Sequence, residues 1–341
     1  MNEATILHVM ILDKFLPSFI DFIDEHFGRE NHHYVFITSE KYEYGLTKEH
    51  NVEFLHTDDD IFITLLECMI QAKKIILHGL WRDKIDLLLY SNQTLLKKCY
   101  WVMWGGDFYF PETKSVMRKE VIKKMGHCIP VNYGDYLYIK EHYTSSAIYH
   151  ECLNYPRSIL IQNKDFSVER NKDNVKKVLV GNSATQTNFH FEIFDKLRGT
   201  NNIEVYVPLS YGDKDYAKEV IAYGRKCFQY FYPLVHSMDS SSYQLFLETM
   251  DVAIFKHNRQ QAVSTMMSLL GMGKTVYMSK IPTTWEMFAH LGMFIKDIDI
   301  FTALDEISTA EARFNISTIN DTFSERKAAY AWGKVFSYGS D

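Results

Sequence analysis

Two loops in the second half of the sequence combine residue types that suit a negatively charged ligand. Residues 181–187 read Gly-Asn-Ser-Ala-Thr-Gln-Thr and lie between a strand-like run and a helical one, and residues 257–261 read His-Asn-Arg-Gln-Gln at a second such junction. Backbone N–H groups and the helix dipole favour an anion there, and the planar fork of Arg259 suits a diphosphate. An ordinary turn remains the alternative for the first loop, and a solvated loop for the second.

Polar groups of the first half also lie where predicted strands end. Asp107 follows a strand and two glycines, His78 ends another strand, and His8 and Asp13 bracket the end of the first. Glycine lets a substrate approach the backbone closely, and a carboxylate or an imidazole can accept a proton from a hydroxyl group. Asp107 is therefore our first candidate for a general base, followed by Asp13 and His78. The alternative for Asp107 is a cap on the helix that begins near Pro111.

Two other motifs resemble phosphate or metal sites but lack the required context. Residues 271–275 read Gly-Met-Gly-Lys-Thr like the end of a P-loop, but the first glycine of that motif would fall at Ser268, and the segment leads from a helix into a strand. The three aspartates at 58–60 open a predicted helix, where capping explains them. We therefore expect no metal site and no bound cofactor.

Apolar runs of strand length alternate with helical patterns along the chain. Buried continuous strands that alternate with helices indicate parallel β/α units, so we predict an α/β protein. The predicted strands are residues 5–12, 33–38, 52–56, 74–78, 99–103, 175–180, 202–207, 251–256 and 275–278. The predicted helices are residues 16–27, 61–72, 188–197, 215–224, 261–270 and 325–338.

A polar and charged segment, residues 162–174, separates the two halves and is the predicted linker. We therefore predict a first α/β domain over residues 1–162, a second over 175–324, and a C-terminal helix in residues 325–341. Two α/β sheets joined in this way predict a ligand cleft between them, at the carboxyl ends of the strands.

Composition excludes several classes of protein. The 341 residues are 46% hydrophobic and 23% charged, which is typical of a globular protein, and the net charge of −6 disfavours a general nucleic-acid binder. The five cysteines are scattered without a C-x-x-C, so reduced thiols in a cytosolic protein are expected. No apolar run approaches the roughly 20 residues that cross a bilayer, so any membrane contact is expected to be peripheral. The basic stretch at 114–124 is one candidate for such contact, and a solvated helix face is the alternative.

Taken together and in order, three loops resemble the pattern of glycosyltransferase family 56. They are Trp104-Gly105-Gly106-Asp107-Phe108-Tyr109, Val180-Gly181-Asn182-Ser183 and Arg259-Gln260-Gln261. The similarity runs colinearly over most of the chain and includes His8-Val9 with Asp13, His78-Gly79, Gly134-Asp135, Val207-Pro208 with Tyr211, and Trp332. The chain differs from the family pattern at Gly106, at Ala184-Thr185 and at residues 262–265, where the family has alanine, Gly-Asp and a segment that contains glycine.

The resemblance implies a GT-B fold, with two Rossmann-like domains that face each other across a cleft. The first, residues 1–162, would bind the acceptor, the second, residues 175–324, would bind the nucleotide sugar, and the C-terminal helix in residues 325–341 would pack back on the first. It also implies the transfer, with inversion and without a metal ion, of a 4-amino-4,6-dideoxy sugar such as N-acetylfucosamine from a TDP-sugar to a polyprenyl-diphosphate-linked glycan. Such a reaction belongs to bacterial surface polysaccharide synthesis (enterobacterial common antigen or O-antigen), at the cytoplasmic face of the inner membrane, where the enzyme would be peripheral.

By the same resemblance each site residue has an expected role. The expected catalytic residues are Asp107, Asp13 and His78. The expected donor-binding residues are Gly181, Asn182, Ser183, Asn188, Pro208, Tyr211, His257, Arg259, Gln260, Gln261, Ser264 and Thr265. The expected acceptor-binding residues are His8, Trp104, Gly105, Gly106 and Tyr109.

Three alternatives remain open at this point. A GT-B transferase that uses a UDP- or GDP-sugar would differ in its nucleotide preference. A non-hydrolysing sugar-nucleotide epimerase would consume the donor with no acceptor present. A non-catalytic sugar-binding or scaffold protein would bind nucleotide weakly, and the phosphate-suited loops argue against it.

Overall fold

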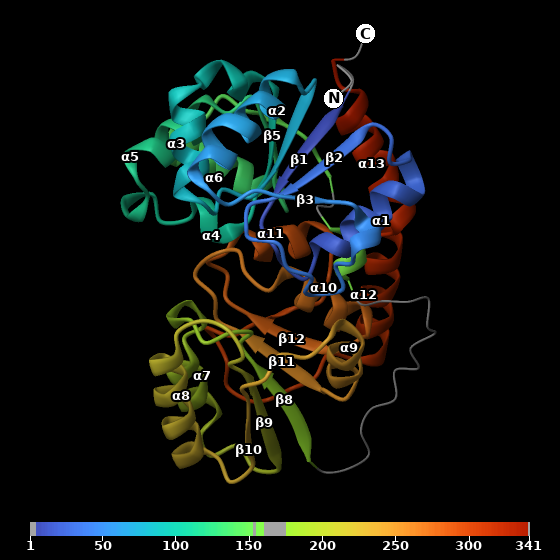
Figure 1. The fold of residues 1–341 in the computed structure, drawn as a ribbon. Coiled ribbons are helices and arrows are strands. Elements are labelled where there is room, and N and C mark those ends of the chain that lie inside the picture. The colour runs from blue at the N-terminus through green and yellow to red at the C-terminus, as the bar shows by residue number, and fades with distance from the viewer. Residues whose placement is uncertain (1–4, 153–154, 160–174, 340–341) are drawn as a thin grey trace. The chain divides into compact units, whose positions relative to one another are not determined.

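The computed structural model describes residues 5–152, 155–159 and 175–339, and it shows two compact units (Figure 1). The first unit is formed by Met1–Ser158 together with Phe323–Asp341, and the second by Ile159–Thr322. The predicted linker at 162–174 lies outside the described residues. No helix of the described part is long and apolar enough to cross a bilayer.

The first unit is built on a seven-stranded parallel sheet with the order β3-β2-β1-β4-β5-β6-β7. The central strands are buried on both faces, which explains their continuous apolar sequences. The strands are β1 (Ile6–Met10), β2 (His32–Phe36), β3 (Glu53–Phe54), β4 (Lys74–His78), β5 (Cys99–Val102), β6 (His127–Ile129) and β7 (Ile148–Tyr149).

Helices cover both faces of this sheet. Residues of α2, α3, α5 and α6 contribute to one apolar cluster, and residues of α1 and α13 to another, where the buried Trp332 meets Phe19 with 5.0 Å between ring centroids. The helices are α1 (Leu16–Phe27), α2 (Leu66–Gln71), α3 (Asp83–Ser91), α4 (Gly105–Phe108), α5 (Val116–Lys124), α6 (Tyr133–Tyr143) and α13 (Glu325–Ser337). Shorter turns are η1 (Lys48–His50), the π-helical η2 (Asp60–Leu65), η3 (Gln93–Lys98), η4 (Pro111–Thr113) and η5 (Pro156–Ser158).

The second unit has a six-stranded parallel sheet with the order β10-β9-β8-β11-β12-β13. Its strands are β8 (Lys176–Val180), β9 (Ile203–Pro208), β10 (Phe231–Leu234), β11 (Val252–Phe255), β12 (Thr275–Met278) and β13 (Lys296–Asp297). Its helices are η6 (Gln186–Asn188), α7 (His190–Leu197), α8 (Lys214–Cys227), α9 (Ser240–Glu248), α10 (Val263–Gly271), α11 (Thr283–His290) and α12 (Thr309–Thr322).

Both sheets reverse their strand order beside their first strand. In the first unit β1 lies between β2 and β4, and in the second β8 lies between β9 and β11. Ligands of such open α/β sheets bind at the carboxyl ends of the strands at this switch point, because the connections there leave on opposite faces. The predicted α/β fold is therefore confirmed, and a ligand is expected at the carboxyl edge of each sheet, beside β1 and beside β8.

Candidate functional site

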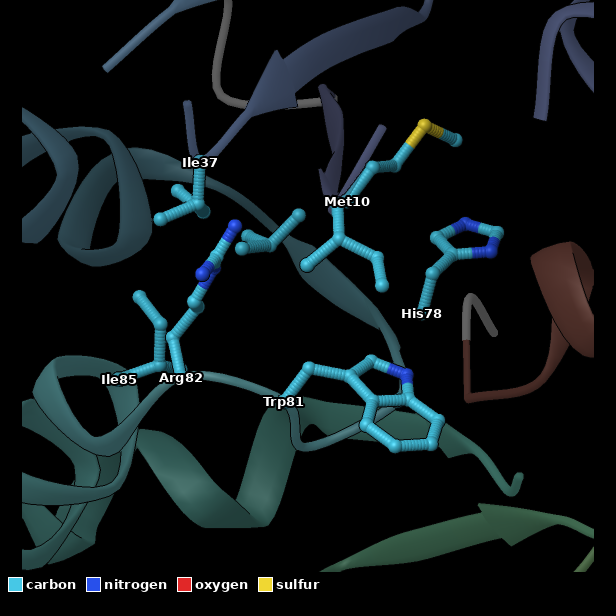
Figure 2. A pocket seen from close by; sticks show the side chains of 9 residues that line it. Met10, Ile37, His78, Trp81, Arg82 and Ile85 are labelled. Atoms are coloured by element: carbon cyan, nitrogen blue, oxygen red, sulfur yellow. The ribbon is translucent and has the colours of Figure 1, made fainter. Parts of the chain in front are cut away.

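A hollow lies at the switch point of the first unit (Figure 2). It is shallow: the space between its side chains is about 230 Å³ only when the open solvent at its mouth is included, and its enclosed part is about 10 Å³, room for about one water molecule. Met10, Ile37 and Ile85 supply apolar walls, while Trp81 and Arg82 project into the hollow from the loop after β4. The hollow therefore combines an apolar surface, an aromatic ring and one cationic side chain.

The indole of Trp81 explains two of the glycines in this region. A Cβ atom on Gly79 would lie 2.1 Å from the Trp81 indole nitrogen, and one on Gly106 would lie 2.6 Å from its ring carbon. Gly79 also has a φ of +83°, which favours glycine. The same ring meets Trp104 edge to face at 5.5 Å. Gly106, expected to let a substrate approach, thus makes room for Trp81.

The sequence motifs did not single out Trp81 and Arg82. Both lie just after His78-Gly79, separated from it by Leu80, and their position in the loop after a strand was the available signal. Arg82 is exposed, and it forms no ion pair within the described part of the chain. The indole N–H of Trp81 is buried with no hydrogen-bond partner in the described part of the chain. Arg82 is thus accessible to a ligand, and the half-buried Trp81 keeps one hydrogen-bond donor without a partner among the described residues.

Asp107 lies completely buried, with its carboxylate turned inward. One oxygen accepts hydrogen bonds from the backbone N–H of Leu80 at 3.0 Å and the indole of Trp101 at 2.8 Å, and the other accepts from the backbone N–H of Trp104 at 3.1 Å. Burial raises the pKa of Asp107 to about 7, against the effect of these donors and of Arg118. The buried carboxylate thus accepts hydrogen bonds from the loop at both oxygens and fixes the loop, an arrangement that favours Asp13 over Asp107 as the base.

Asp13 has the position and the freedom that Asp107 lacks. It lies just beyond the carboxyl end of β1 and is half-buried. One carboxylate oxygen accepts a hydrogen bond from the backbone N–H of Phe15 at 3.2 Å. Burial raises the pKa of Asp13 from its ordinary value, which brings a carboxylate closer to the range where a general base works best.

His78 and His8 belong to a buried chain of hydrogen bonds. The indole of Trp104 donates to the hydroxyl of Tyr155 at 3.0 Å, and that hydroxyl lies 3.0 Å from Nδ1 of His78. Nε2 of His78 lies 3.1 Å from Nδ1 of His8, and Nε2 of His8 lies 2.9 Å from Nδ1 of His32. Both ring nitrogens of His78, which lines the hollow, are thus engaged, and His8 is fully buried. This arrangement favours Asp13 over His78 as the base, and the chain of hydrogen bonds positions Trp104 at the edge of the sheet.

Burial keeps the three histidines of this chain neutral. It lowers the pKa of His78 to about 3 and that of His32 to about 4, and it lowers the pKa of His8 well below its ordinary value, with help from both neighbours. Below pH 6.5 these histidines therefore bind protons in the unfolded chain but stay neutral in the folded chain. We expect the free energy of unfolding to fall between pH 7 and pH 5, by up to about 1.4 kcal/mol per pH unit for each histidine. Urea unfolding at several pH values measures it.

Asp107 changes the free energy of unfolding in the opposite direction as the pH falls, because its raised pKa makes the folded chain bind the proton more tightly. Variants separate the contribution of the histidines from that of Asp107. The pH dependence should weaken in His78→Gln and persist in His142→Gln, since His142 is exposed. Equal pH slopes in the wild type and His78→Gln would contradict a neutral buried His78.

The other predicted acceptor residues differ in their exposure. Trp104 is half-buried at the loop surface, whereas Gly105 is buried at the start of α4. Tyr109 is buried as well, and its hydroxyl donates to Asp135 at 2.8 Å. Tyr109 therefore ties the loop to helix α6, which favours a supporting role over the predicted contact with the acceptor.

In the second unit the first predicted loop folds around Asn188. The side-chain oxygen of Asn188 accepts hydrogen bonds from the backbone N–H of Asn182 at 2.9 Å and from Nε2 of His257 at 3.0 Å. Its amide nitrogen donates to the Ser183 hydroxyl at 3.2 Å. Gly181 has a φ of +67°, and a Cβ atom there would lie 2.7 Å from the Asn188 oxygen. The loop thus needs glycine at 181 on two counts.

Several predicted donor residues are therefore internal supports. Asn188 and Ser183 are fully buried, and His257 is 2% exposed with its pKa lowered to about 3 by burial. The predicted helix at 188–197 corresponds to α7, which begins at the buried His190 after the turn η6, so the loop does not lead directly into a helix start. These residues shape the loop, and they do not offer their side chains to a ligand.

Gln261 joins the two predicted loops. Its amide nitrogen donates to the side-chain oxygen of Asn182 at 2.8 Å and to the Ser183 hydroxyl at 3.2 Å, and its oxygen accepts from the Thr187 hydroxyl at 2.8 Å. The loop after β8 and the loop after β11 thus form one surface. The half-buried side chains of Asn182, Thr185 and Thr187 lie along it.

Arg259 and the start of α10 lie beside this surface. The guanidinium of Arg259 is half-buried and donates to the carbonyl of the buried Gln260 at 3.1 Å. Helix α10 has no side-chain cap, because its N-cap is Ala262, which has a left-handed φ of +56°. Ser264 and Thr265 are half-buried in its first turn. An uncapped helix start with a guanidinium three residues before it suits a phosphate group.

The predicted residues after β9 complete this edge. Pro208 ends β9 and is buried, whereas Tyr211 is 54% exposed. The Tyr211 hydroxyl accepts a hydrogen bond from the side-chain amide of Asn182 at 2.7 Å. Tyr211 therefore offers an exposed ring next to the phosphate-suited loops, while Pro208 supports the strand end.

Solved structures share this fold at low sequence identity. A glycosyltransferase from Rickettsia africae has a TM-score of 0.67 and 12% identity, with 99% of this chain and 98% of the other covered. Anabaena Alr3699/HepE in complex with UDP has a TM-score of 0.62 and 12% identity, with 98% and 94% covered. A putative UDP-N-acetylglucosamine 2-epimerase from Listeria monocytogenes has a TM-score of 0.55 and 11% identity, with 96% and 90% covered. These similarities concern the fold.

The two parallel sheets with their interleaved helices have the GT-B fold of glycosyltransferases. The epimerase shows that the fold is shared with another enzyme class, so the family has to be decided by sequence. The family model of the 4-alpha-L-fucosyltransferases of glycosyl transferase group 56 matches residues 14–322, and the chain belongs to this family. The resemblance found in the sequence is thereby confirmed, and the chain is a glycosyltransferase.

Proposed function

We propose that the chain moves a 4-amino-4,6-dideoxy sugar, such as N-acetylfucosamine, from a TDP-sugar to a glycan on a polyprenyl diphosphate. The product would enter bacterial surface polysaccharide, either enterobacterial common antigen or O-antigen. Membership of group 56 supports a glycosyltransferase. The observation that carries the donor assignment is the surface in which Gln261 joins the two loops beside Arg259 and the uncapped start of α10.

The donor diphosphate is proposed to bind on this surface. The leaving TDP gains negative charge as the sugar departs, so groups that meet this charge accelerate the reaction. Arg259 supplies a planar pair of donors, and the start of α10 supplies the positive end of its dipole. The proposal requires no divalent cation. The UDP complex of Anabaena HepE supports a nucleotide ligand for this fold, and this neighbour's nucleotide is a diphosphate of a different base.

The acceptor is proposed to bind at the hollow of the first unit, with Asp13 as the base. The acceptor hydroxyl oxygen attacks the anomeric carbon from the side opposite to the leaving group. The new carbon–oxygen bond forms as the bond to the TDP oxygen breaks, and the hydroxyl proton passes to the Asp13 carboxylate. The electron pair leaves with TDP, and the sugar is transferred with inversion.

Trp81 and Arg82 are proposed to hold the acceptor. An indole face stacks on a sugar ring, and a guanidinium binds an anionic group of the acceptor. We expect Arg82→Ala and Trp81→Ala each to raise the KM for the acceptor by about 10–100-fold, the loss of a charge-assisted hydrogen bond or of a stacking surface. The KM for the donor should not change. Initial rates at varied acceptor and saturating donor measure it.

Arg326→Ala is the matched control for Arg82, because Arg326 is also exposed but lies on α13. It should leave both KM values unchanged. A normal acceptor KM in Arg82→Ala and Trp81→Ala would move the acceptor away from this hollow, while the donor assignment would stand.

The nucleotide is tested by thermal shift with TDP, UDP or GDP, with and without magnesium or EDTA. A ligand at about 100 times its Kd adds about 2.7 kcal/mol of apparent stability. We expect TDP to stabilise the chain most and EDTA to have no effect. A preference for UDP or GDP would show that the donor is a UDP- or GDP-sugar instead of a TDP-sugar. Consumption of the donor without an acceptor would favour the epimerase reaction.

We further propose that the enzyme works as a peripheral protein at the cytoplasmic face of the inner membrane, where a polyprenyl-linked acceptor would be carried. The basic stretch around α5 does not support this proposal. Lys114 donates to the carbonyl of Gly106 at 2.9 Å, and Arg118 pairs with the buried Asp86 at 2.7 Å. Lys124 pairs with Glu120, one turn earlier on the same helix, at 2.7 Å. Most of these cations are thus engaged within the chain.

A further inference from the structure

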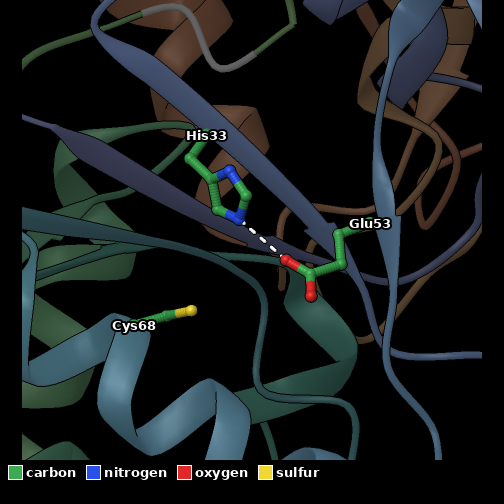
Figure 3. Close-up of side chains that lie close together, drawn as sticks. All are labelled: His33, Glu53 and Cys68. Atoms are coloured by element: carbon green, nitrogen blue, oxygen red, sulfur yellow. Dashed lines mark hydrogen bonds and ion pairs between the residues drawn. The ribbon is translucent and has the colours of Figure 1, made fainter. Parts of the chain in front are cut away.

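Three side chains with different metal-binding atoms meet at one edge of the first sheet (Figure 3). His33 is the second residue of β2, Glu53 is the first residue of β3, and Cys68 lies on α2. Nε2 of His33 lies 2.9 Å from a carboxylate oxygen of Glu53. The ligand atoms of all three lie within 4.8 Å of one another, and all three residues are half-buried.

Strand register explains why the first two residues face the same side. Glu53 pairs with Val35 across the parallel strands, and His33 is two residues before Val35, so both point to one face of the sheet. Further along that face Val35 and Leu55 are buried in the apolar cluster that includes α2. Cys68 packs against this same cluster from the helix. His33 and Glu53 are thus polar residues on an otherwise apolar face of the sheet, which the Cys68 thiol approaches from α2.

We propose that His33, Glu53 and Cys68 bind a transition-metal ion such as Zn²⁺. Imidazole, thiolate and carboxylate are the ligands of zinc, whereas Mg²⁺ and Ca²⁺ take oxygen ligands. Tetrahedral zinc ligands lie roughly 3.3–3.8 Å apart, so a modest movement of Cys68 toward the other two closes the set. Water completes the fourth position.

The protons balance in this binding step. The hydrogen bond between His33 and Glu53 is exchanged for two bonds to the metal, with the remaining imidazole proton on Nδ1. Cys68 binds as a thiolate and releases one proton to solvent. Because its burial raises the pKa of this thiol, metal binding has to supply the free energy of that deprotonation.

The proposed metal site would have a structural role, holding β2, β3 and α2 together, and no catalytic one. His33 and Glu53 lie near the amino ends of their strands, opposite to the carboxyl edge with Asp13 and Trp81. β3 is an edge strand of two residues, and a metal would fix it and α2 to β2. The inference is therefore independent of the sugar donor and acceptor.

A second group of possible ligands does not carry the same inference. Glu25, His26 and Glu325 are exposed, and the guanidinium of Arg157 already pairs with both glutamates. A metal ion there would have to displace that cation.

The experiment uses Co²⁺ as a spectroscopic probe on the reduced, tag-free chain. Cobalt replaces zinc in such sites, and a bound thiolate gives it a charge-transfer absorption band in the near ultraviolet. We expect this band to saturate at one cobalt per chain and to be absent in Cys68→Ser. Cys227→Ser is the matched control, because Cys227 is also half-buried but lies on α8 beside Arg198, and it should keep the band.

A second measurement covers the case in which Cys68→Ser does not fold. Glu53→Gln and His33→Gln keep the thiol, and each should weaken cobalt binding at least about tenfold, as expected for the loss of one ligand. Zn²⁺ should raise the Tm of the wild type and of Cys227→Ser. A wild type without the band, or a band that disappears in Cys227→Ser and persists in Cys68→Ser, would overturn the proposal.

Discussion

Arg259→Ala should lower the kcat of sugar transfer by about 10²–10³-fold, which corresponds to the loss of about 3–4 kcal/mol of transition-state stabilisation. The physical reason is the charge that develops on the departing TDP next to the start of α10, where Arg259 is the charged donor. Arg259→Lys should recover only part of the rate, because an ammonium group keeps the charge but lacks the planar fork. The measurement is the steady-state rate at saturating donor and acceptor.

Arg198→Ala is the matched control in the same unit. The Arg198 side chain pairs with Asp195 at 3.0 Å on the exposed surface of α7, away from the loops. It should leave kcat unchanged, and all variants should unfold in urea near the wild-type midpoint. A folded Arg259→Ala enzyme with a wild-type rate would show that the diphosphate is held elsewhere.

Asp13→Asn should reduce kcat by about 10²–10⁴-fold while TDP still stabilises the chain in thermal shift. An amide cannot accept the hydroxyl proton, whereas the donor surface in the second unit is unchanged. In the wild type the rate should fall as the pH drops through the raised pKa of Asp13, because the protonated carboxyl group cannot act as a base. Asp13→Asn should lack this pH step.

Asp107→Asn separates the two candidate bases. An amide there places an N–H group against donors that now face a carboxylate, so the folded state should lose about 1–3 kcal/mol, the cost of a buried unsatisfied donor. The residual activity should keep the wild-type pH step. A stable but inactive Asp107→Asn together with an active Asp13→Asn would restore Asp107 as the base.

The sequence predicts the sheets well where strands are long and apolar. The predicted strands at 74–78, 175–180 and 275–278 correspond closely to β4, β8 and β12. Short strands such as β7 and β13, with two residues each, carry no pattern of their own and exist because a neighbouring strand pairs with them. The predicted helix at 61–72 is divided into a π-helical turn and α2, a distinction that periodicity does not resolve.

For the loops at the carboxyl edges of the two sheets, the sequence likewise predicted the location but not the orientation of the side chains. Residue types after the strands predicted which loops matter, since parallel strands bring their carboxyl ends to one edge whatever the side chains do. Which side chains face outward depends on partners distant in sequence. Asp107 turns inward because Trp101 and Leu80 supply donors, and His8 is engaged by His78 and His32.

Local patterns and colinear motifs were thus enough to predict the α/β class, the family and the loops at the sheet edges. The supporting roles of Asn188 and Asp107, and the hollow lined by Trp81 and Arg82, became apparent only in the folded chain. This is because a buried polar group must find its hydrogen-bond partners wherever the fold brings them. A side chain is left for a ligand only after those partners have been assigned.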